Sequence, residues 1–206
     1  MSYISDEKDT SEISSFVNHL RTETIVIRTH NLSFHVHRGL LEEKCSALYN
    51  YLTTPDWNSP PSESLYINTS NEVMSSFLQW LYTDTYPIKH NPQDADNTST
   101  TTTDASTNEF TISLMHHTRT YIFAYVYQIP ILRDLAAKHV TKMVEAHKSW
   151  AEDTTPLLMA TRLALVTLPD ADPLVCVFRA IILTYMEMWQ TPGFIALIKD
   201  HGPTSP

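Results

Sequence analysis

The stretch FHVHRGLLEEKC, residues 34–45, changes midway from the side-chain pattern of a strand to that of a helix. Its first residues alternate, with apolar Phe34 and Val36 separated by a polar residue, which predicts a strand. From about residue 38 onward the apolar residues recur at helical spacing. The preceding residues 24–33 read TIVIRTHNLS and predict the partner strand and its turn. The sequence therefore predicts a hairpin that continues directly into a helix.

Most of the remaining chain has the apolar spacing of helices. The helical pattern after the hairpin extends to residue 52, a third strand is expected at Leu65-Tyr66-Ile67, and Asn71 is the expected N-cap of the next helix. Apolar residues at helical intervals predict further helices over residues 71–82, 112–128, 131–144, 157–168, 174–189 and about 194–199. This order of elements predicts an α+β fold whose C-terminal third is all helical.

Two segments differ in composition from these elements. Residues 1–21 are mostly polar, and we expect a flexible N-terminal segment there. Residues 91–108 contain almost no large apolar side chain, so burial cannot offset the entropy of ordering them. We therefore expect a disordered insertion over about residues 90–109, inside a domain spanning residues 22–147. A helical extension is expected over residues 154–200.

The overall composition excludes several classes of protein. The chain has 206 residues, with 14 Lys and Arg against 23 Asp and Glu, for a formal net charge of −9. Because no Lys or Arg cluster is present, we expect no nucleic-acid partner. The three glycines form no Gly-rich phosphate loop. Because the N-terminus is polar, we expect no signal peptide. No apolar run is long enough to predict a membrane span. Two distant cysteines are typical of a reduced intracellular protein, cytoplasmic or nuclear.

The histidines and cysteine of the opening stretch raise the question of a metal or catalytic site. His35, His37 and Cys45 offer three possible zinc ligands, but a structural zinc site needs four and no second spaced pair is present. Cys45 could also form a catalytic dyad with a histidine, but the sequence shows no sign of an oxyanion hole. Glu42 and Glu43 would moreover raise the pKa of the Cys45 thiol. We expect His37 to cap the helix through local hydrogen bonds, His35 to be solvated and Cys45 to be a small buried residue.

Other candidate groups also favour a structural role. The adjacent His116 and His117 lie on a predicted helix, where neighbours point about 100° apart and do not bind one ion jointly. No set of nucleophile, base and orienting residue is present, and no paired carboxylates stand out. The sequence therefore predicts no enzyme, no cofactor and no metal.

Three motifs follow one another along the chain. The first is Phe34-His35-Val36-His37-Arg38, with Leu41 after it. The second is the strand at 65–67 followed by Trp80-Leu81-Tyr82-Thr83. The third comprises Tyr121, Ala124, Ile129, Pro130 and Leu132. In this order, over residues 22–147, they resemble the BTB/POZ family, in the divergent form common in filamentous fungi. The chain departs from the family pattern at Glu23-Thr24, Cys45, Leu48 and Asp84, where Ser-Asp, Ser, an aromatic residue and Gly are usual.

The resemblance implies a BTB/POZ fold, with a small three-stranded sheet packed with a cluster of helices, followed by the helical extension. It also implies a non-enzymatic protein–protein interaction module that homodimerises through the first strand, the first helix and neighbouring surface. The corresponding positions, which the sequence does not separate into core and interface, are Ile25, Ile27, Phe34, Arg38, Leu41 and Leu48. Protein partners are implied, with no nucleic acid, membrane or small-molecule substrate.

Two other functions are implied by members of the same family. Many BTB proteins are substrate adaptors that dock on the cullin scaffold of a ubiquitin ligase, and the corresponding surface here includes Tyr82, Tyr86, Met115 and Tyr121. Others recruit corepressors and regulate transcription, although no DNA-reading segment occurs in this sequence. The expected primary function is a homodimerising scaffold, with the adaptor and the indirect transcriptional regulator as alternatives.

Overall fold

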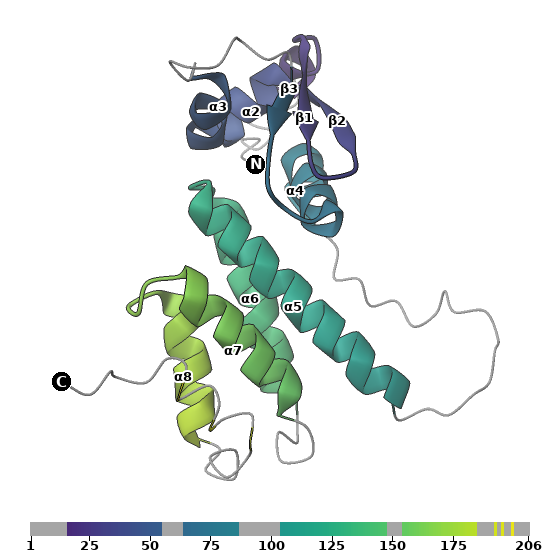
Figure 1. The fold of residues 1–206 in the computed structure, drawn as a ribbon. Helices are drawn as coiled ribbons and strands as arrows, with labels where there is room; N and C mark the ends of the chain where they lie inside the picture. Colours follow the sequence, from purple (N-terminus) through teal and green to yellow (C-terminus); the bar gives the residue numbers. More distant parts are fainter. Residues whose placement is uncertain are drawn as a thin grey trace, which may run out of the picture. The chain divides into compact units, whose positions relative to one another are not determined.

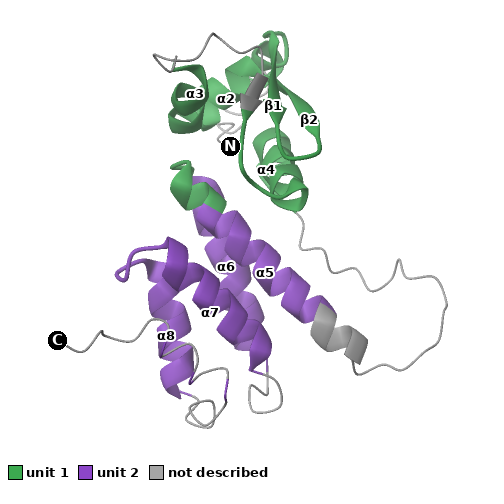
Figure 2. Ribbon diagram, viewed as in Figure 1, with its two compact units in different colours: residues 1–86, 123–130 green, residues 87–122, 131–206 purple. Residues whose placement is uncertain are grey.

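The computed structural model describes residues 16–54, 64–86, 104–147 and 154–184, together with residues 192, 195 and 199 (Figure 1). These residues form an α+β structure that is mostly helical, as predicted. The chain divides into two compact units (Figure 2): unit 1 comprises residues 1–86 and 123–130, and unit 2 comprises residues 87–122 and 131–206. This division places a boundary between residues 86 and 87, inside the domain expected over residues 22–147.

Among its described residues, unit 1 contains a three-stranded sheet in the order β2-β1-β3. Strands β1 (Thr24–Arg28) and β2 (Ser33–His37) pair antiparallel, whereas β3 (Ser64–Tyr66) runs parallel to β1. The hairpin turn is closed by Thr29, whose N–H donates to the carbonyl of Leu32 at 2.9 Å. The hairpin and the third strand were both predicted, and the sheet confirms them.

The helix expected over residues 38–52 is two helices, and the prediction of one continuous helix is wrong. Helix α2 (Arg38–Lys44) ends and helix α3 (Ser46–Thr53) begins at Cys45, whose backbone is non-helical at φ −139° and ψ 48°. The Cys45 N–H still donates to Leu41 and its carbonyl accepts from Tyr49, each at 2.8 Å. Because the apolar spacing continues through the break, periodicity reports a buried face and does not detect the bend.

Helix α4 (Asn71–Thr83) is capped one residue before the predicted N-cap, Asn71. Ser70 is the N-cap, and its hydroxyl accepts from the Val73 N–H at 3.4 Å. The Asn71 side chain instead accepts a hydrogen bond of 2.7 Å from the hydroxyl of Thr29, which ties the helix start to the hairpin. Both residues are common N-caps, so the tertiary contact of Asn71 decides between them. Helical spacing predicts that Met74, Phe77, Leu78 and Leu81 share one face of this helix. Met74, Phe77 and Leu81 are buried together with Trp80, whereas Leu78 is half-buried.

Helix α5 (Asp104–Val126) begins well before the predicted start at residue 112. Residues 104–109 of the expected disordered insertion are therefore helical, whereas its residues 90–103 lie outside the described part of the chain. A helix can extend beyond its buried stripe, because each added residue costs little once the helix has formed. The start of α5 therefore could not be predicted from the segment of few large apolar residues, because part of that segment is helical.

The secondary structure of unit 2 is all helical over its described residues. Helices α5 and α6 (Pro130–Ala146) run antiparallel, as the contacts Phe110–His147, Ser113–Met143 and His117–His139 show. Helices α7 (Thr155–Thr167) and α8 (Pro173–Thr184) pack on each other. The predicted continuation of α8 to residue 189 lies outside the described segments. Of the helix expected over 194–199, only residues 195 and 199 are described, and both are helical.

Candidate functional site

The first motif of the sequence contacts the second through His37 and Tyr82. The Tyr82 hydroxyl lies 2.9 Å from His37 Nδ1 and accepts a hydrogen bond of 3.2 Å from the His37 backbone N–H. The two rings meet edge to face, with centroids 5.9 Å apart. His37 is the N-cap residue of α2, as expected, but its side chain makes no capping hydrogen bond. The expected local hydrogen bonding is therefore wrong, because the ring binds a helix far along the chain.

Arg38 and Glu23 form an exposed ion pair where β1 and β2 meet α2. The guanidinium lies 2.7 Å from the Glu23 carboxylate and 5.5 Å from the centroid of the Tyr49 ring. The hydrogen bond to Glu23 is the main cause that raises the pKa of Arg38, so the guanidinium stays charged. Ile25 is half-buried on the same side of β1 as Glu23, because alternate residues of a strand share a face. Glu23, Ile25 and Arg38 are hereafter the β1-end cluster.

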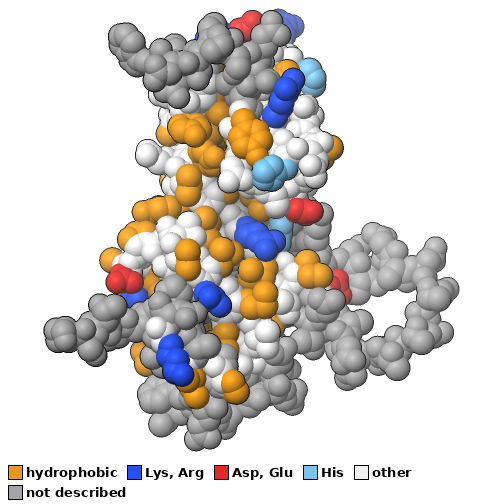
Figure 3. All heavy atoms as spheres, viewed as in Figure 1, with side chains coloured by type: hydrophobic (Ala, Val, Ile, Leu, Met, Phe, Trp, Pro, Cys, Tyr) orange, Lys and Arg blue, Asp and Glu red, His pale blue; other side chains and the backbone are white. Residues whose placement is uncertain are grey.

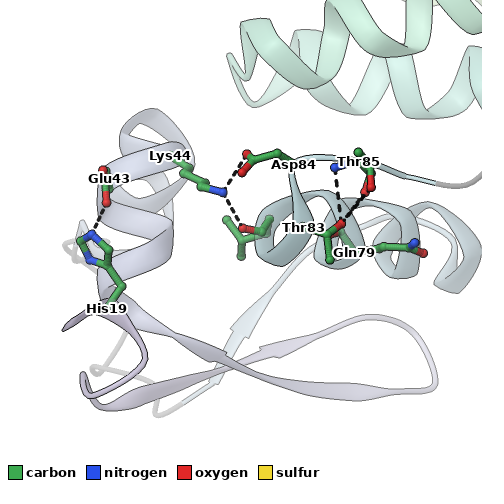
Figure 4. A network of polar contacts seen from close by, with 8 residues as sticks. His19, Glu43, Lys44, Gln79, Thr83, Asp84 and Thr85 are labelled. Atoms are coloured by element: carbon green, nitrogen blue, oxygen red, sulfur yellow. Dashed lines mark hydrogen bonds and ion pairs between the residues drawn. The ribbon is translucent and has the colours of Figure 1, made fainter. Parts of the chain in front are cut away.

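Lys44 connects the end of α2 to the end of α4 (Figure 4). Its ammonium donates to the Leu81 carbonyl at 3.0 Å and to the Asp84 carboxylate at 2.8 Å. Asp84 is the left-handed C-cap of α4, with φ 57°, at the position where the family usually has Gly. A cation at a helix C-terminus is favourable, and Asp tolerates this backbone better than most residues. The left-handed Asp84 is therefore held by an ion pair with Lys44.

Gly39 provides room for the residues that precede the sheet. Its N–H donates to the Thr22 hydroxyl at 3.0 Å, and a Cβ at this position would lie 2.9 Å from both the Thr22 methyl and His19 Nδ1. His19 also forms an ion pair with Glu43 of α2 (Figure 4). The absence of a side chain at Gly39 thus permits the segment containing His19 and Thr22 to pack on α2.

The possible metal ligands and nucleophile of the first motif are placed in different environments. His35 is exposed, as expected, whereas Cys45 is buried with 2% of its surface accessible. Burial raises the pKa of the Cys45 thiol to about 12, which disfavours the thiolate that a nucleophile needs. Among the described residues no group of three or more His, Cys, Asp and Glu is arranged to hold a metal ion.

The positions that correspond to the family's dimer interface separate into core and surface. Ile27, Leu41 and Leu48 have no accessible surface and belong to the core. Ile25 and Phe34 are half-buried, and Arg38 is exposed. Only the latter three can contact a second molecule without opening the fold. The sequence could not make this distinction, because core and interface residues have the same apolar character.

The four residues assigned to an adaptor surface also differ in their exposure to solvent. Tyr86 and Tyr121 are buried, and burial is the main cause that raises the pKa of each phenol. Tyr82 in unit 1 and Met115 in unit 2 are half-buried. The expectation that Tyr86 and Tyr121 present a partner surface is therefore wrong for the described structure, because both side chains fill its interior.

The third motif is mostly structural. Ala124, Ile129 and Leu132 are buried, whereas Pro130 is exposed as the first residue of α6. The turn before α6 places Gln128 at a positive φ of 53°, and the Ile129 N–H donates to the Ala124 carbonyl at 2.8 Å. The motif thus contains the predicted break between two helices, although α5 ends two residues before the predicted end at 128 and α6 begins one residue before the predicted start at 131.

Asp172 is a buried carboxylate whose role the sequence reading missed. It accepts hydrogen bonds from the Tyr121 hydroxyl at 2.9 Å and from the Leu174 N–H at 2.8 Å. It therefore fixes the start of α8 and ties it to α5, within unit 2. The dipeptide Asp172-Pro173 before an apolar run was a detectable signal, because Asp is a favoured N-cap and Pro a favoured first helical residue.

Comparisons with models of protein families and with curated proteins found no match to this chain. No helix of the described segments has both the length and the apolar character needed to cross a membrane.

Proposed function

We propose that this protein is a non-enzymatic protein–protein interaction module of the BTB/POZ type that forms homodimers. The observation that supports this proposal is the hydrogen bond between His37 and Tyr82. It brings together two motifs that lie apart in the sequence and whose order carries the family resemblance. Their polar side chains bind each other, and this contact supports a structural role for both residues.

The proposed contact between two copies is centred on the β1-end cluster. Ile25 supplies half-buried apolar surface, and the Arg38–Glu23 pair supplies opposite charges beside it. In a two-fold interface the same patch faces itself, so Arg38 of each copy can meet Glu23 of the other. Apolar side chains are exposed elsewhere as well, among the described residues of both units (Figure 3). We choose the β1-end cluster because it also lies on the strand and helix that the family resemblance implicates.

The oligomeric state tests the proposal. Light scattering or sedimentation equilibrium at micromolar concentration should give twice the chain mass of 23.5 kDa. Ile25→Glu should shift the equilibrium to the monomer while circular dichroism stays unchanged, because it adds a charge to the apolar centre of the contact. Leu32→Glu is the matched control, since Leu32 is an exposed apolar residue at the other end of the hairpin. A mass of 23.5 kDa for the wild type at high concentration contradicts homodimerisation.

The adaptor function has a weaker basis. With Tyr86 and Tyr121 buried, its expected surface is reduced to Tyr82 and Met115, which lie in different units. A pull-down of the full chain with cullin scaffolds distinguishes the two functions. The adaptor function would replace the scaffold proposal if a monomeric wild type captures a cullin specifically. Tyr82→Ala should then abolish the capture while the variant remains folded.

A further inference from the structure

Two histidines from different helices stack on each other inside unit 2. The rings of His117 on α5 and His139 on α6 have centroids 4.9 Å apart and planes inclined by 20°. His117 has no accessible surface and His139 is half-buried. His116 adds a third imidazole, with its ring edge to face against His117 at 5.5 Å. Three rings that can each take a proton therefore meet where α5 packs on α6.

We propose that the His117–His139 stack makes the packing of α5 against α6 sensitive to acid, so that unit 2 loosens as pH falls through the titration range of histidine. Neutral rings pack as flat aromatic surfaces and contribute the attraction expected of buried aromatic pairs. Protonated rings at the same separation repel each other, and each must also lose hydration to stay in place. The contact therefore favours the folded state only while the stacked rings are neutral. This inference does not depend on the proposed function.

The positive charge of Lys142 strengthens this effect at His139. Burial, and then the positive charge of Lys142 on α6, lower the pKa of His139. Asp172, the carboxylate from the segment before α8, binds the Tyr121 hydroxyl one turn along α5 from His117. Arg133 on α6 acts electrostatically on the same tyrosine. Among these groups Lys142 acts on a ring of the stack, whereas Asp172 binds the Tyr121 hydroxyl and the Leu174 N–H.

The sign of the effect follows from the lowered pKa of His139. Because the folded chain holds this proton less strongly, the unfolded chain binds more protons once pH falls below the ordinary histidine value of 6.5. The free energy of unfolding then decreases as pH decreases. Above that value both states are neutral at this position, and the contribution is fully present.

Urea unfolding of the full chain at pH 7 and pH 5 tests the proposal. His139→Phe keeps a flat ring in the stack but cannot take a proton. We expect the unfolding equilibrium constant of the wild type to rise severalfold more between these pH values than that of His139→Phe. Lys142→Gln should give an intermediate response, because it removes the neighbouring positive charge. Equal responses of the wild type and His139→Phe would overturn the proposal.

Two further measurements keep the test decisive. His35→Gln is the control, because His35 is exposed on β2 of unit 1 and its replacement should leave the wild-type response unchanged. If His139→Phe does not fold, amide hydrogen exchange on the wild type replaces it. After correction for intrinsic exchange rates, protection around His117 and His139 should fall more between pH 7 and pH 5 than protection in β1. A uniform loss of protection across both units would contradict a switch located at the stack.

Discussion

The Tyr82 hydroxyl lies 2.9 Å from His37 Nδ1 and so links helix α4 to the point where strand β2 becomes helix α2. The same hydroxyl accepts the backbone N–H of His37, which is the last residue of β2 and pairs with Thr24 in the sheet. One side chain thus fixes both the ring and the backbone of the residue at which the hairpin ends. The junction between strand and helix is stabilised from outside its own segment.

Removing this hydroxyl should destabilise the fold. Tyr82→Phe leaves the His37 N–H and ring without their partner, and we expect a loss of about 1 kcal/mol in the free energy of unfolding. Tyr66→Phe is the matched control, because Tyr66 also binds a histidine, His30 Nδ1, at 2.9 Å but at an exposed site. Its loss should be smaller, since water replaces an exposed partner. Equal losses in urea unfolding would show that the His37–Tyr82 contact has no special role.

Gly39 should not tolerate alanine, although alanine is usually the better helix former. In an open helix Gly→Ala stabilises by about 0.5–1 kcal/mol. Here the added Cβ would lie 2.9 Å from the Thr22 methyl, so we expect Gly39→Ala to destabilise by about 1–2 kcal/mol. The cost should shrink in a Thr22→Ala background, because the methyl is then absent. A stabilising effect of Gly39→Ala would show that the preceding segment does not pack on α2.

The two cysteines should differ in their reaction with thiol reagents. Cys176 is exposed and should be labelled quickly at pH 8, whereas Cys45 is buried with its pKa raised to about 12 and should react only after denaturation. Cys176→Ser should therefore remove the fast phase and leave the slow one. Because the unfolded thiol ionises first, the contribution of Cys45 to stability should be lost as pH rises from 9.0 to about 12. Fast labelling of native Cys176→Ser would reopen the possibility of a reactive Cys45.

Two aspartates close in sequence should have different effects on stability. Asp172→Ala removes the N-cap of α8 and leaves the buried Tyr121 hydroxyl without its acceptor, so we expect a loss of about 2 kcal/mol. Asp170→Ala breaks only an exposed ion pair with Arg179, and its effect should stay within about 0.5 kcal/mol. Thermal or urea unfolding of the two variants side by side measures the difference. A similar cost for both would mean that Asp172 is not the cap described above.

The local pattern of the chain predicted its elements well where one face is apolar. The alternation through Phe34 and Val36 gave the strand, and the spacing of Met74, Phe77 and Leu81 gave the buried face of α4. Periodicity failed at Cys45, where the backbone turns without interrupting the apolar face. It also failed at the start of α5, because a helix that has formed can continue into residues without an apolar pattern.

The sequence by itself therefore determined the order of the elements and which face of each is buried. Both follow from the local pattern of apolar and polar residues. The tertiary structure alone decided that His37 binds Tyr82, that Ile27 is core while Ile25 stays half-buried, and that Asp172 binds Tyr121. These outcomes depend on which surfaces meet after the chain folds. A hydrogen bond between residues distant in sequence forms only once packing has excluded water around both, and no local pattern records that encounter.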